Sequence, residues 1–334
     1  MVRAAIIGLG WWGKVLVNSV WNKSDAIRFV AGLTRSRAKA EDFCREKNIV
    51  LRDKLDEILA DPQIDALVLA TPHSQHAEQI KQAAKAGKHV FVEKPFTLDV
   101  KSAKAALAAA AKAKIVVGID FQRRFHPSIA EIRQRVRDGR LGAIGFCEAE
   151  FTAPAGLFLP KESWRINPEE TPAGAMTGVG VHLVDCFIDF FGEIKEVYCM
   201  NARRAAPHSD DTTVVLMRFK NGVIASIHGS IATAANYRVA VYGSRGLAEA
   251  VNPGLDIFRF VPAPEGPSSQ PSALQPEIIE TKGFDMVRAA LEAFAHAIRS
   301  KTPFPIPPEQ IVHGVAAFVA IVRSAKTHRP VKVS

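Results

Sequence analysis

The glycine-rich segment near the N-terminus sets the strongest limit on the fold of this chain. An apolar run of strand character is followed directly by Gly8-Leu9-Gly10-Trp11-Trp12-Gly13, which leads into a helical pattern. Glycines at this spacing permit a tight turn and let backbone N–H groups approach a pyrophosphate at the helix N-terminus. We therefore predict a dinucleotide site on Gly8, Gly10 and Gly13. Trp11 and Trp12 are candidates to line the dinucleotide site, and packing between helix and sheet is their alternative role.

Strands and helices alternate regularly through about residue 120. Apolar strands are expected at residues 2–7, 27–33, 66–70, 89–92 and 115–119, with helical patterns between most of them. This alternation is typical of a doubly wound parallel sheet. In such sheets, ligands bind beyond the carboxyl ends of the strands, so the residues that follow each strand are candidates for a site.

The second of these strands ends in Thr34-Arg35-Ser36. Dinucleotide folds usually present an acidic side chain to the adenosine ribose at this point, and this segment has none. A guanidinium flanked by hydroxyl groups suits a 2′-phosphate, which a carboxylate would repel. We therefore predict NADP(H) as the preferred cofactor and NAD(H) as the alternative. A solvated loop in which Ser36 caps a helix is the purely structural interpretation.

A charged lysine follows the apolar strand at residues 89–92. Pro95 ends this strand, so Lys94 is expected to project into the crevice beyond the sheet, although a surface lysine is the plain alternative. The preceding strand ends in Thr71-Pro72-His73. His73 and His76 flank the start of the next helix, where local hydrogen bonding is the more ordinary role for a histidine.

The rhythm of the sequence changes after Phe121. Strand patterns at residues 144–151, 197–202, 212–219, 223–231 and 237–243 include several consecutive runs without a helix between them, which favours an antiparallel sheet in an α+β domain. A helix is expected at residues 176–190, and a loop rich in Pro, Ser and Gly at 253–276. We predict a dinucleotide-binding domain at residues 1–122 and a substrate-binding and oligomerisation domain at 123–334, whose last helix can pack back on the first domain.

Composition excludes several classes of protein. The 334 residues are enough for two cores, and 48% hydrophobic with 23% charged residues is typical of a globular protein without membrane spans. The net charge of +9 is spread along the chain without a basic run, so no nucleic-acid partner is expected. The cysteines are far apart among apolar neighbours, which indicates reduced packing residues, and no metal site is predicted. The N-terminus lacks the features of a secretory signal, which favours a cytoplasmic location.

Four blocks of sequence resemble the Gfo/Idh/MocA oxidoreductase family in order and spacing. They are GLGWWG at 8–13, TPHSQHAEQIKQAAKAGKHVFVEKP at 71–95, FQRRFHP at 121–127 and WRINPEETPAGAMTGVGVHLVD at 164–185. The resemblance implies an N-terminal Rossmann domain, with a C-terminal α+β domain built on a large open, mostly antiparallel sheet. It also implies hydride transfer between a nicotinamide cofactor and a carbinol carbon of a sugar, inositol or related polyol.

By this resemblance Lys94 corresponds to the E-K-P lysine beside the nicotinamide, and His182 to the histidine of the catalytic D-x-x-x-H motif. Lys94 would stabilise developing alkoxide charge and His182 would act as the base. We expect further cofactor contacts from Thr71, Pro72, His73, His76, Glu93 and Pro95. Substrate contacts are expected from Arg123, Arg124, Trp164, Arg165 and Asp185.

One position departs from the family pattern. Gly178 stands four residues before His182, where the family commonly has Asp, and glycine can neither carry a proton nor orient an imidazole. Asp185, another group or water takes this role, or the reaction differs. Two alternatives to polyol oxidation follow: another nicotinamide-dependent reaction, such as imine or dihydrodiol chemistry or redox-cycled glycoside cleavage, and a non-catalytic dinucleotide-binding sensor.

The strands of the second half also bear on assembly. Between residues 197 and 243 they alternate or run apolar, and no helix in the sequence is left to cover the second face of their sheet. An exposed apolar face of that size normally marks an interface. We therefore predict a homodimer or homotetramer.

Overall fold

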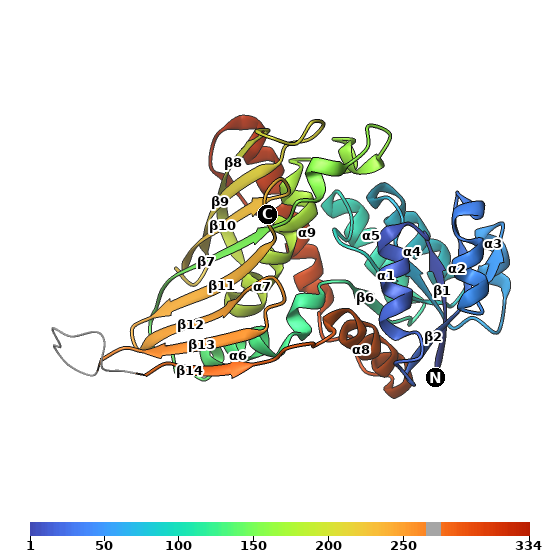
Figure 1. Cartoon of the computed structure of the whole chain (residues 1–334), viewed down its shortest axis with the longest axis horizontal. Coiled ribbons are helices and arrows are strands. Elements are labelled where there is room, and N and C mark those ends of the chain that lie inside the picture. The colour runs from blue at the N-terminus through green and yellow to red at the C-terminus, as the bar shows by residue number, and fades with distance from the viewer. Residues whose placement is uncertain (265–274) are drawn as a thin grey trace. The chain divides into compact units, whose positions relative to one another are not determined.

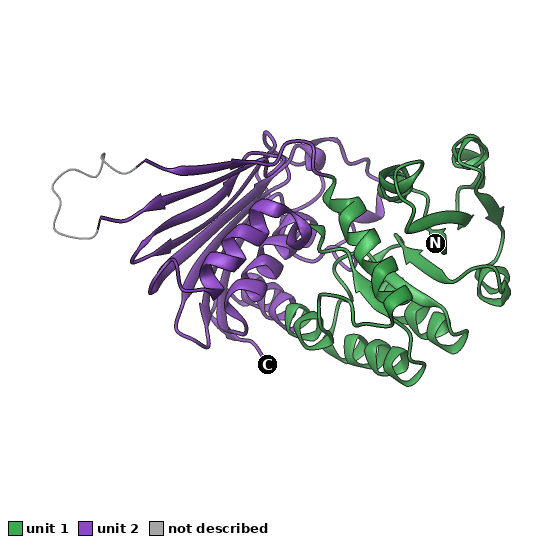
Figure 2. Cartoon of the chain, turned by 90° about the horizontal axis from the view of Figure 1, so that it is seen from below, with its two compact units in different colours: residues 1–122, 285–315 green, residues 123–284, 316–334 purple. Residues whose placement is uncertain are grey.

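The computed structural model describes residues 1–264 and 275–334 and divides into two compact units. Unit 1 comprises residues 1–122 and 285–315, and unit 2 comprises 123–284 and 316–334 (Figure 2). Residues 285–315 therefore pack with the N-terminal unit, although they follow the second unit in sequence. The functional assignment of the two predicted domains stays a prediction.

Unit 1 is built on six parallel strands in the order β3-β2-β1-β4-β5-β6, of which β1, β2 and β6 are labelled in Figure 1. This order confirms the predicted doubly wound sheet. Strands β2 and β3 are added on one side of β1 and strands β4 to β6 on the other, and sheets of this kind bind ligands at the point between β1 and β4 where the strand order reverses. The strands are β1 (Val2–Ile7), β2 (Ile27–Leu33), β3 (Val50–Arg52), β4 (Ala66–Leu69), β5 (His89–Val92) and β6 (Val117–Ile119). The helices are α1 (Trp11–Val20), α2 (Glu41–Glu46), α3 (Leu55–Ala60), α4 (His76–Lys85), α5 (Val100–Lys112) and α8 (Met286–Ser300).

Helix α8 covers part of this sheet. Its buried side comprises Ala290, Leu291, Phe294, Ala295 and Ala297. The Phe294 ring lies 5.5 Å from that of Phe91 in β5. A Cβ added at Gly118 in β6 would come within 2.8 Å of Phe91 and 3.1 Å of Phe294, so only glycine lets the helix approach this closely. The helix is thus an integral part of the first core.

Unit 2 is built on nine strands in the order β14-β13-β12-β11-β7-β10-β9-β8-β15. All neighbours are antiparallel except β7 and β10, which confirms the predicted open, mostly antiparallel sheet. The strands are β7 (Ile144–Thr152), β8 (Ile194–Ala202), β9 (Thr212–Phe219), β10 (Ile224–Ser230), β11 (Asn236–Gly243), β12 (Gly246–Val251), β13 (Ile257–Pro262), β14 (Glu277–Glu280) and β15 (Val331–Lys332). The loop expected at 253–276 is wrong for residues 257–262, which form β13, and residues 265–274 lie outside the described residues.

Helices α6 (Pro127–Arg137) and α7 (Val181–Phe191) lie against one face of this sheet (Figure 2). Helix α9 (Pro308–Thr327) begins in unit 1 and continues in unit 2 after Val315. The other face of the sheet carries large apolar side chains that are exposed in the single chain, among them Phe146, Met200, Leu216 and Ile224. None of the helices in the described part of the chain combines the length and apolarity needed to cross a membrane.

Candidate active site

The glycine turn at the start of α1 has the geometry of a phosphate-binding turn. Gly8 has φ of +101°, and an added Cβ would lie 2.5 Å from the Ala70 carbonyl oxygen. A Cβ at Gly13 would lie 1.9 Å from the carbonyl oxygen of Gly8, so a side chain at either position would break the turn. At Gly10, by contrast, an added Cβ would meet no atom within 4 Å, so the space before the helix is open.

These features fit a dinucleotide. Gly10 is the N-cap of α1 and no side chain caps the helix, so its first N–H groups point toward the open space. Unpaired N–H groups at a helix N-terminus bind phosphate through hydrogen bonds and the helix dipole. Residues of the turn and the first turn of α1 would therefore hold the pyrophosphate.

The two tryptophans of the turn differ in environment. Trp11 is 72% exposed at the start of α1. Trp12 turns inward, and its indole Nε1–H donates a hydrogen bond to Oε1 of Glu93. That both tryptophans line the cofactor site stays a prediction. Trp12 additionally joins α1 to the end of β5.

In the segment after β2, the guanidinium of Arg35 is exposed and can reach an anionic ligand. Thr34 is half-buried, while Arg35 and Ser36 are exposed, and Ser36 does not cap the short helix that follows. Arg37 pairs with Glu41 at 3.3 Å and Asp53 at 2.6 Å. Within residues 1–264 and 275–334, Arg35 forms no such ion pair, so it can approach an anionic group without first breaking one.

The strand-end histidines have structural contacts. His76 is fully buried, and its ring nitrogens lie 3.1 Å from the carbonyl oxygen of Pro95 and 3.2 Å from that of Thr71. The His73 ring packs edge-on against His76 at 5.7 Å, and Pro72 joins Thr71 to this pair. These residues therefore brace the segment that follows β5.

Lys94 lies at the carboxyl end of β5, as the sequence indicates. The backbone N–H of Glu93 donates to the Leu69 carbonyl at 2.9 Å, so Lys94 is the first residue beyond the pairing with β4. The Lys94–Pro95 peptide is cis. Burial and the neighbouring Asp120 raise the pKa of Glu93 well above its usual range, against smaller opposing effects of Lys94 and Trp12.

In unit 2, His182 lies in the first turn of α7, directly after a π-helical turn at Met176–Gly180. π-helical turns are frequent at functional sites. The imidazole is buried, and its ring centre lies 5.9 Å from that of Phe151 in β7. The guanidinium of Arg123 lies 4.5 Å above the same Phe151 ring and 4.4 Å above Tyr237. Phe151 thus brings two predicted site residues of this unit together.

The glycine before His182 leaves room for a side chain. Gly178 is exposed, and a Cβ added there would meet only Cγ2 of Ile231, at an ordinary 3.6 Å. The absence of a carboxylate at this position is therefore a property of the sequence rather than a demand of the packing.

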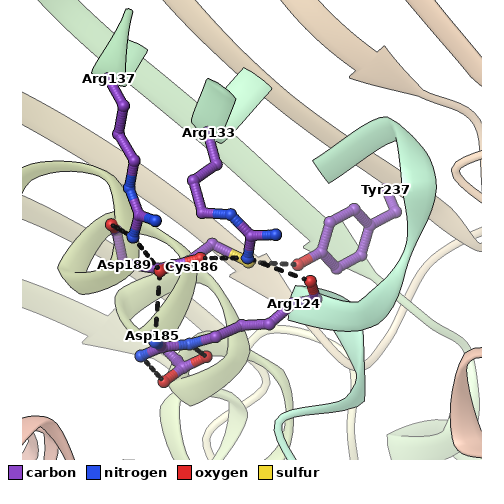
Figure 3. A network of polar contacts seen from close by, with 7 residues as sticks. All are labelled: Arg124, Arg133, Arg137, Asp185, Cys186, Asp189 and Tyr237. Carbon is purple, nitrogen blue, oxygen red and sulfur yellow. Dashed lines mark hydrogen bonds and ion pairs between the residues drawn. The ribbon is translucent and has the colours of Figure 1, made fainter. Parts of the chain in front are cut away.

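Arg124 and Asp185 form a buried, bidentate ion pair (Figure 3). Nε and Nη2 of Arg124 donate to the two carboxylate oxygens of Asp185 at 2.7 and 2.6 Å. Asp189, one turn further along α7, accepts from Arg133 at 3.0 Å and Arg137 at 3.1 Å. Burial raises the pKa of Asp185 to about 6, while Arg124 opposes this change. Both oxygens of Asp185 thus face Arg124, which joins α7 to the segment before α6, while the Asp189 contacts join α7 to α6 itself.

Trp164 and Arg165 lie in a short 3₁₀ turn of unit 2, where the guanidinium stacks 4.3 Å from the indole ring. Their substrate contacts stay predictions, as do those of Arg123, Arg124 and Asp185. The sequence reasoning overlooked Asp120, which is fully buried at the end of β6 beside Glu93. The strand-end rule that singled out Lys94 applies equally to Asp120 and could have found it.

Comparison with known proteins gives consistent matches. The profile for the Gfo/Idh/MocA oxidoreductase family, NAD-binding Rossmann fold, matches residues 2–121, and that for the Gfo/Idh/MocA C-terminal domain matches 129–249. The chain is 31% identical over 260 residues to the uncharacterized oxidoreductase YrbE of Bacillus subtilis, covering 75% of this chain and 74% of that protein. It is 27% identical over 262 residues to myo-inositol 2-dehydrogenase of Thermotoga maritima, covering 73% and 74%.

Among solved structures, levoglucosan dehydrogenase in complex with NADH is similar with a TM-score of 0.87 at 20% identity. The similarity covers 100% of this chain and 99% of that one. At this level of identity the likeness establishes a shared fold.

Proposed function

We propose that this chain, which belongs to the Gfo/Idh/MocA family of NAD-binding oxidoreductases, transfers a hydride between a nicotinamide cofactor and a carbinol carbon of a sugar, inositol or related polyol. The observation that carries the proposal is the placement of Lys94. It follows β5 at the sheet edge where the open glycine turn follows β1, within one unit. Relatives named as inositol dehydrogenases support a polyol substrate.

The nicotinamide ring supplies the hydride acceptor or donor when the cofactor is bound. In the oxidation direction the ammonium of Lys94 hydrogen-bonds the substrate oxygen and stabilises the alkoxide charge that develops as its proton leaves. His182 accepts that proton, because an imidazole has a pKa near neutrality and is efficient as a general base there. Arg123, which shares the Phe151 ring with His182, is placed to shape the substrate pocket.

We infer that NADP(H) is the preferred cofactor. Support comes from Arg35, which is exposed after β2 and, in the described part of the chain, is not held by a carboxylate. A 2′-phosphate would gain a charge-assisted hydrogen bond there, whereas the ribose hydroxyls of NAD(H) would find no acidic acceptor in Thr34-Arg35-Ser36.

Two further proposals concern the setting of the enzyme. The exposed apolar face of the unit 2 sheet supports self-association as a homodimer or homotetramer, and light scattering at micromolar concentration that showed only monomer would remove this proposal. A cytoplasmic location agrees with four cysteines that are buried free thiols, since the cytosol keeps thiols reduced.

The test is a screen of NADP⁺ and NAD⁺ against inositols, sugars and other polyols, with absorbance of the reduced nicotinamide as the readout. We expect turnover with at least one polyol, and product analysis separates carbinol oxidation from imine, dihydrodiol or glycoside chemistry. Gly178 favours one rival, a dinucleotide-binding sensor without a complete catalytic motif. Tight dinucleotide binding without turnover on any substrate would support the sensor and contradict the enzyme.

A further inference from the structure

Three side chains from separate elements of unit 1 converge beside Lys94. Trp12 belongs to the start of α1, Glu93 follows β5 and Asp120 follows β6. Val92 and Ile119 are partners in the parallel pairing of β5 with β6, so the next residue of each strand leaves the sheet at the same edge. Trp12 donates its indole N–H to one oxygen of Glu93, and the neighbouring carboxyl group of Asp120 raises the pKa of Glu93.

The buried position of Glu93 and Asp120 at neighbouring strand ends favours one shared proton. An ionised carboxylate is only an acceptor, so two of them cannot form a hydrogen bond with each other, whereas one carboxylic acid can donate to one carboxylate. Asp120 has no measurable exposure and Glu93 only 8%, so solvent does little to weaken the repulsion between two negative charges. Burial and Asp120 both raise the pKa of Glu93, which agrees with a protonated Glu93.

Charged and titratable groups lie in the elements next to this pair. Lys94 follows Glu93 directly, and α1 contributes the neutral indole of Trp12. On the side of α4, His76 contacts the carbonyl oxygens of Pro95 and Phe96, and His73 packs against His76. With one proton, the carboxyl pair carries a single negative charge beside the ammonium of Lys94.

We propose that Glu93 is a positioning residue that holds a proton at neutral pH, donates it to Asp120 and accepts from Trp12, thereby fixing the glycine turn, Lys94 and the end of β6 relative to one another. This inference rests on the proposed function, because Lys94 must act on the substrate for its position to affect turnover. Loss of the proton would set two carboxylates against each other directly before Lys94. Misplacement of a reacting group by about an ångström can cost about a hundredfold in rate.

Substitution of Glu93 distinguishes a protonated from an ionised role. Glu93→Gln keeps an acceptor for Trp12 and supplies an N–H donor for Asp120, as the acid form does. Glu93→Ala keeps neither. We expect Glu93→Gln to retain at least about tenfold more turnover than Glu93→Ala, with the difference in kcat rather than in the KM for the dinucleotide. Equal losses in the two variants would show that the negative charge of Glu93 is what matters and would overturn the proposal.

The Trp12 contact is tested in the same way. Trp12→Phe removes the N–H donor while keeping an aromatic ring, and we expect about a tenfold or greater loss in kcat. Trp21→Phe, at the other end of the same helix, is the matched control. If Trp12→Phe only lowered thermal stability and left kcat unchanged, the bond would be structural and the positioning role would be wrong.

The proton has a direct spectroscopic signature that does not depend on activity. Infrared difference spectra of the wild-type protein and Glu93→Gln at neutral pH should show a carboxylic acid C=O stretch that is present only in the wild type. Absence of that band would overturn the proposal even if the enzyme turns over polyols. If the band is present but Lys94→Ala keeps full activity, the catalytic assignment falls while the protonated pair stands.

Discussion

The two units support their candidate catalytic residues in different ways. In unit 1, Lys94 follows the end of a buried strand, beside the Trp12–Glu93–Asp120 cluster, which in the proposed protonation state carries one negative charge. In unit 2, His182 lies on a helix that is fixed by ion pairs among Arg124, Arg133, Arg137, Asp185 and Asp189. The first arrangement follows from adjacent strands and local turns. The second depends on charges up to 61 residues apart in sequence.

The difference has an energetic consequence. A carboxyl pair that keeps its proton avoids the cost of burying two charges, whereas a buried ion pair offsets that cost only while both partners remain. Removing one charge in unit 2 should therefore cost folding free energy. Removing a side chain beside Lys94 should instead lower the turnover rate.

The largest expected effect is on unit 2. Arg124→Met leaves Asp185 buried without its partner, so the free energy of unfolding should fall by about 3–5 kcal/mol. Arg140→Met, which removes an exposed pair with Asp138, is the control and should cost at most about 1 kcal/mol. Urea unfolding measures both. Equal effects would show that the buried network is no stronger than a surface pair, and the contrast between the units would fail.

The next effect is on catalysis. Lys94→Ala and His182→Ala should each lower turnover by about a hundredfold or more, because one removes the alkoxide stabiliser and the other the base. The losses should not add in the double variant, since both groups act on one oxygen. Dinucleotide affinity should change much less, because the glycine turn carries most of it. Lys104→Ala, on the exposed side of α5, is the control, and full activity in the double variant would refute both roles.

A smaller effect is expected at the cofactor. Arg35→Asp replaces a phosphate contact of about 1.5–3 kcal/mol with a repulsive charge, so NADP(H) should bind at least about tenfold more weakly and NAD(H) should become preferred. Arg28→Asp, an exposed arginine within β2, controls for the general loss of positive charge. Equal affinity of the natural protein for NADPH and NADH would contradict the assignment of Thr34-Arg35-Ser36.

The smallest effect concerns Gly178, where a Cβ fits without a close contact. Gly178→Asp would place a carboxylate one turn before His182 and favour the imidazolium. The acid limb of the pH–rate profile for oxidation should therefore move to higher pH, by about half a unit to one unit. Gly178→Ala adds the Cβ without the charge and should leave the limb in place. The same shift in both variants would indicate a packing effect.

Features that depend on residues close together in sequence were predictable, and contacts between residues distant in sequence were not. The glycine turn, the parallel sheet and the place of Lys94 were predicted because they depend on neighbours in sequence. The strand-end rule also points to Asp120, but its closeness to Glu93 was not predictable, because it depends on β6 lying beside β5, which is a property of the strand order. The Arg124–Asp185 pair was likewise hidden, since both residues were interpreted as substrate contacts. Strand β13 was assigned to a loop because Pro and Gly dominate the sequence around it.

The position of α8 has a consequence for how the chain is made. Unit 1 is a discontinuous domain, because residues 285–315 complete a core that begins at residue 1, with most of the second unit encoded in between. Until α8 leaves the ribosome, the surface around Phe91 and Gly118 lacks the cover that Phe294 provides. During synthesis, the part of the Rossmann sheet that α8 covers therefore stays exposed until the strands of the second unit up to residue 284 have been made. A fragment that ends at residue 122 would keep this uncovered surface permanently, so a minimal dinucleotide-binding fragment must join the two segments.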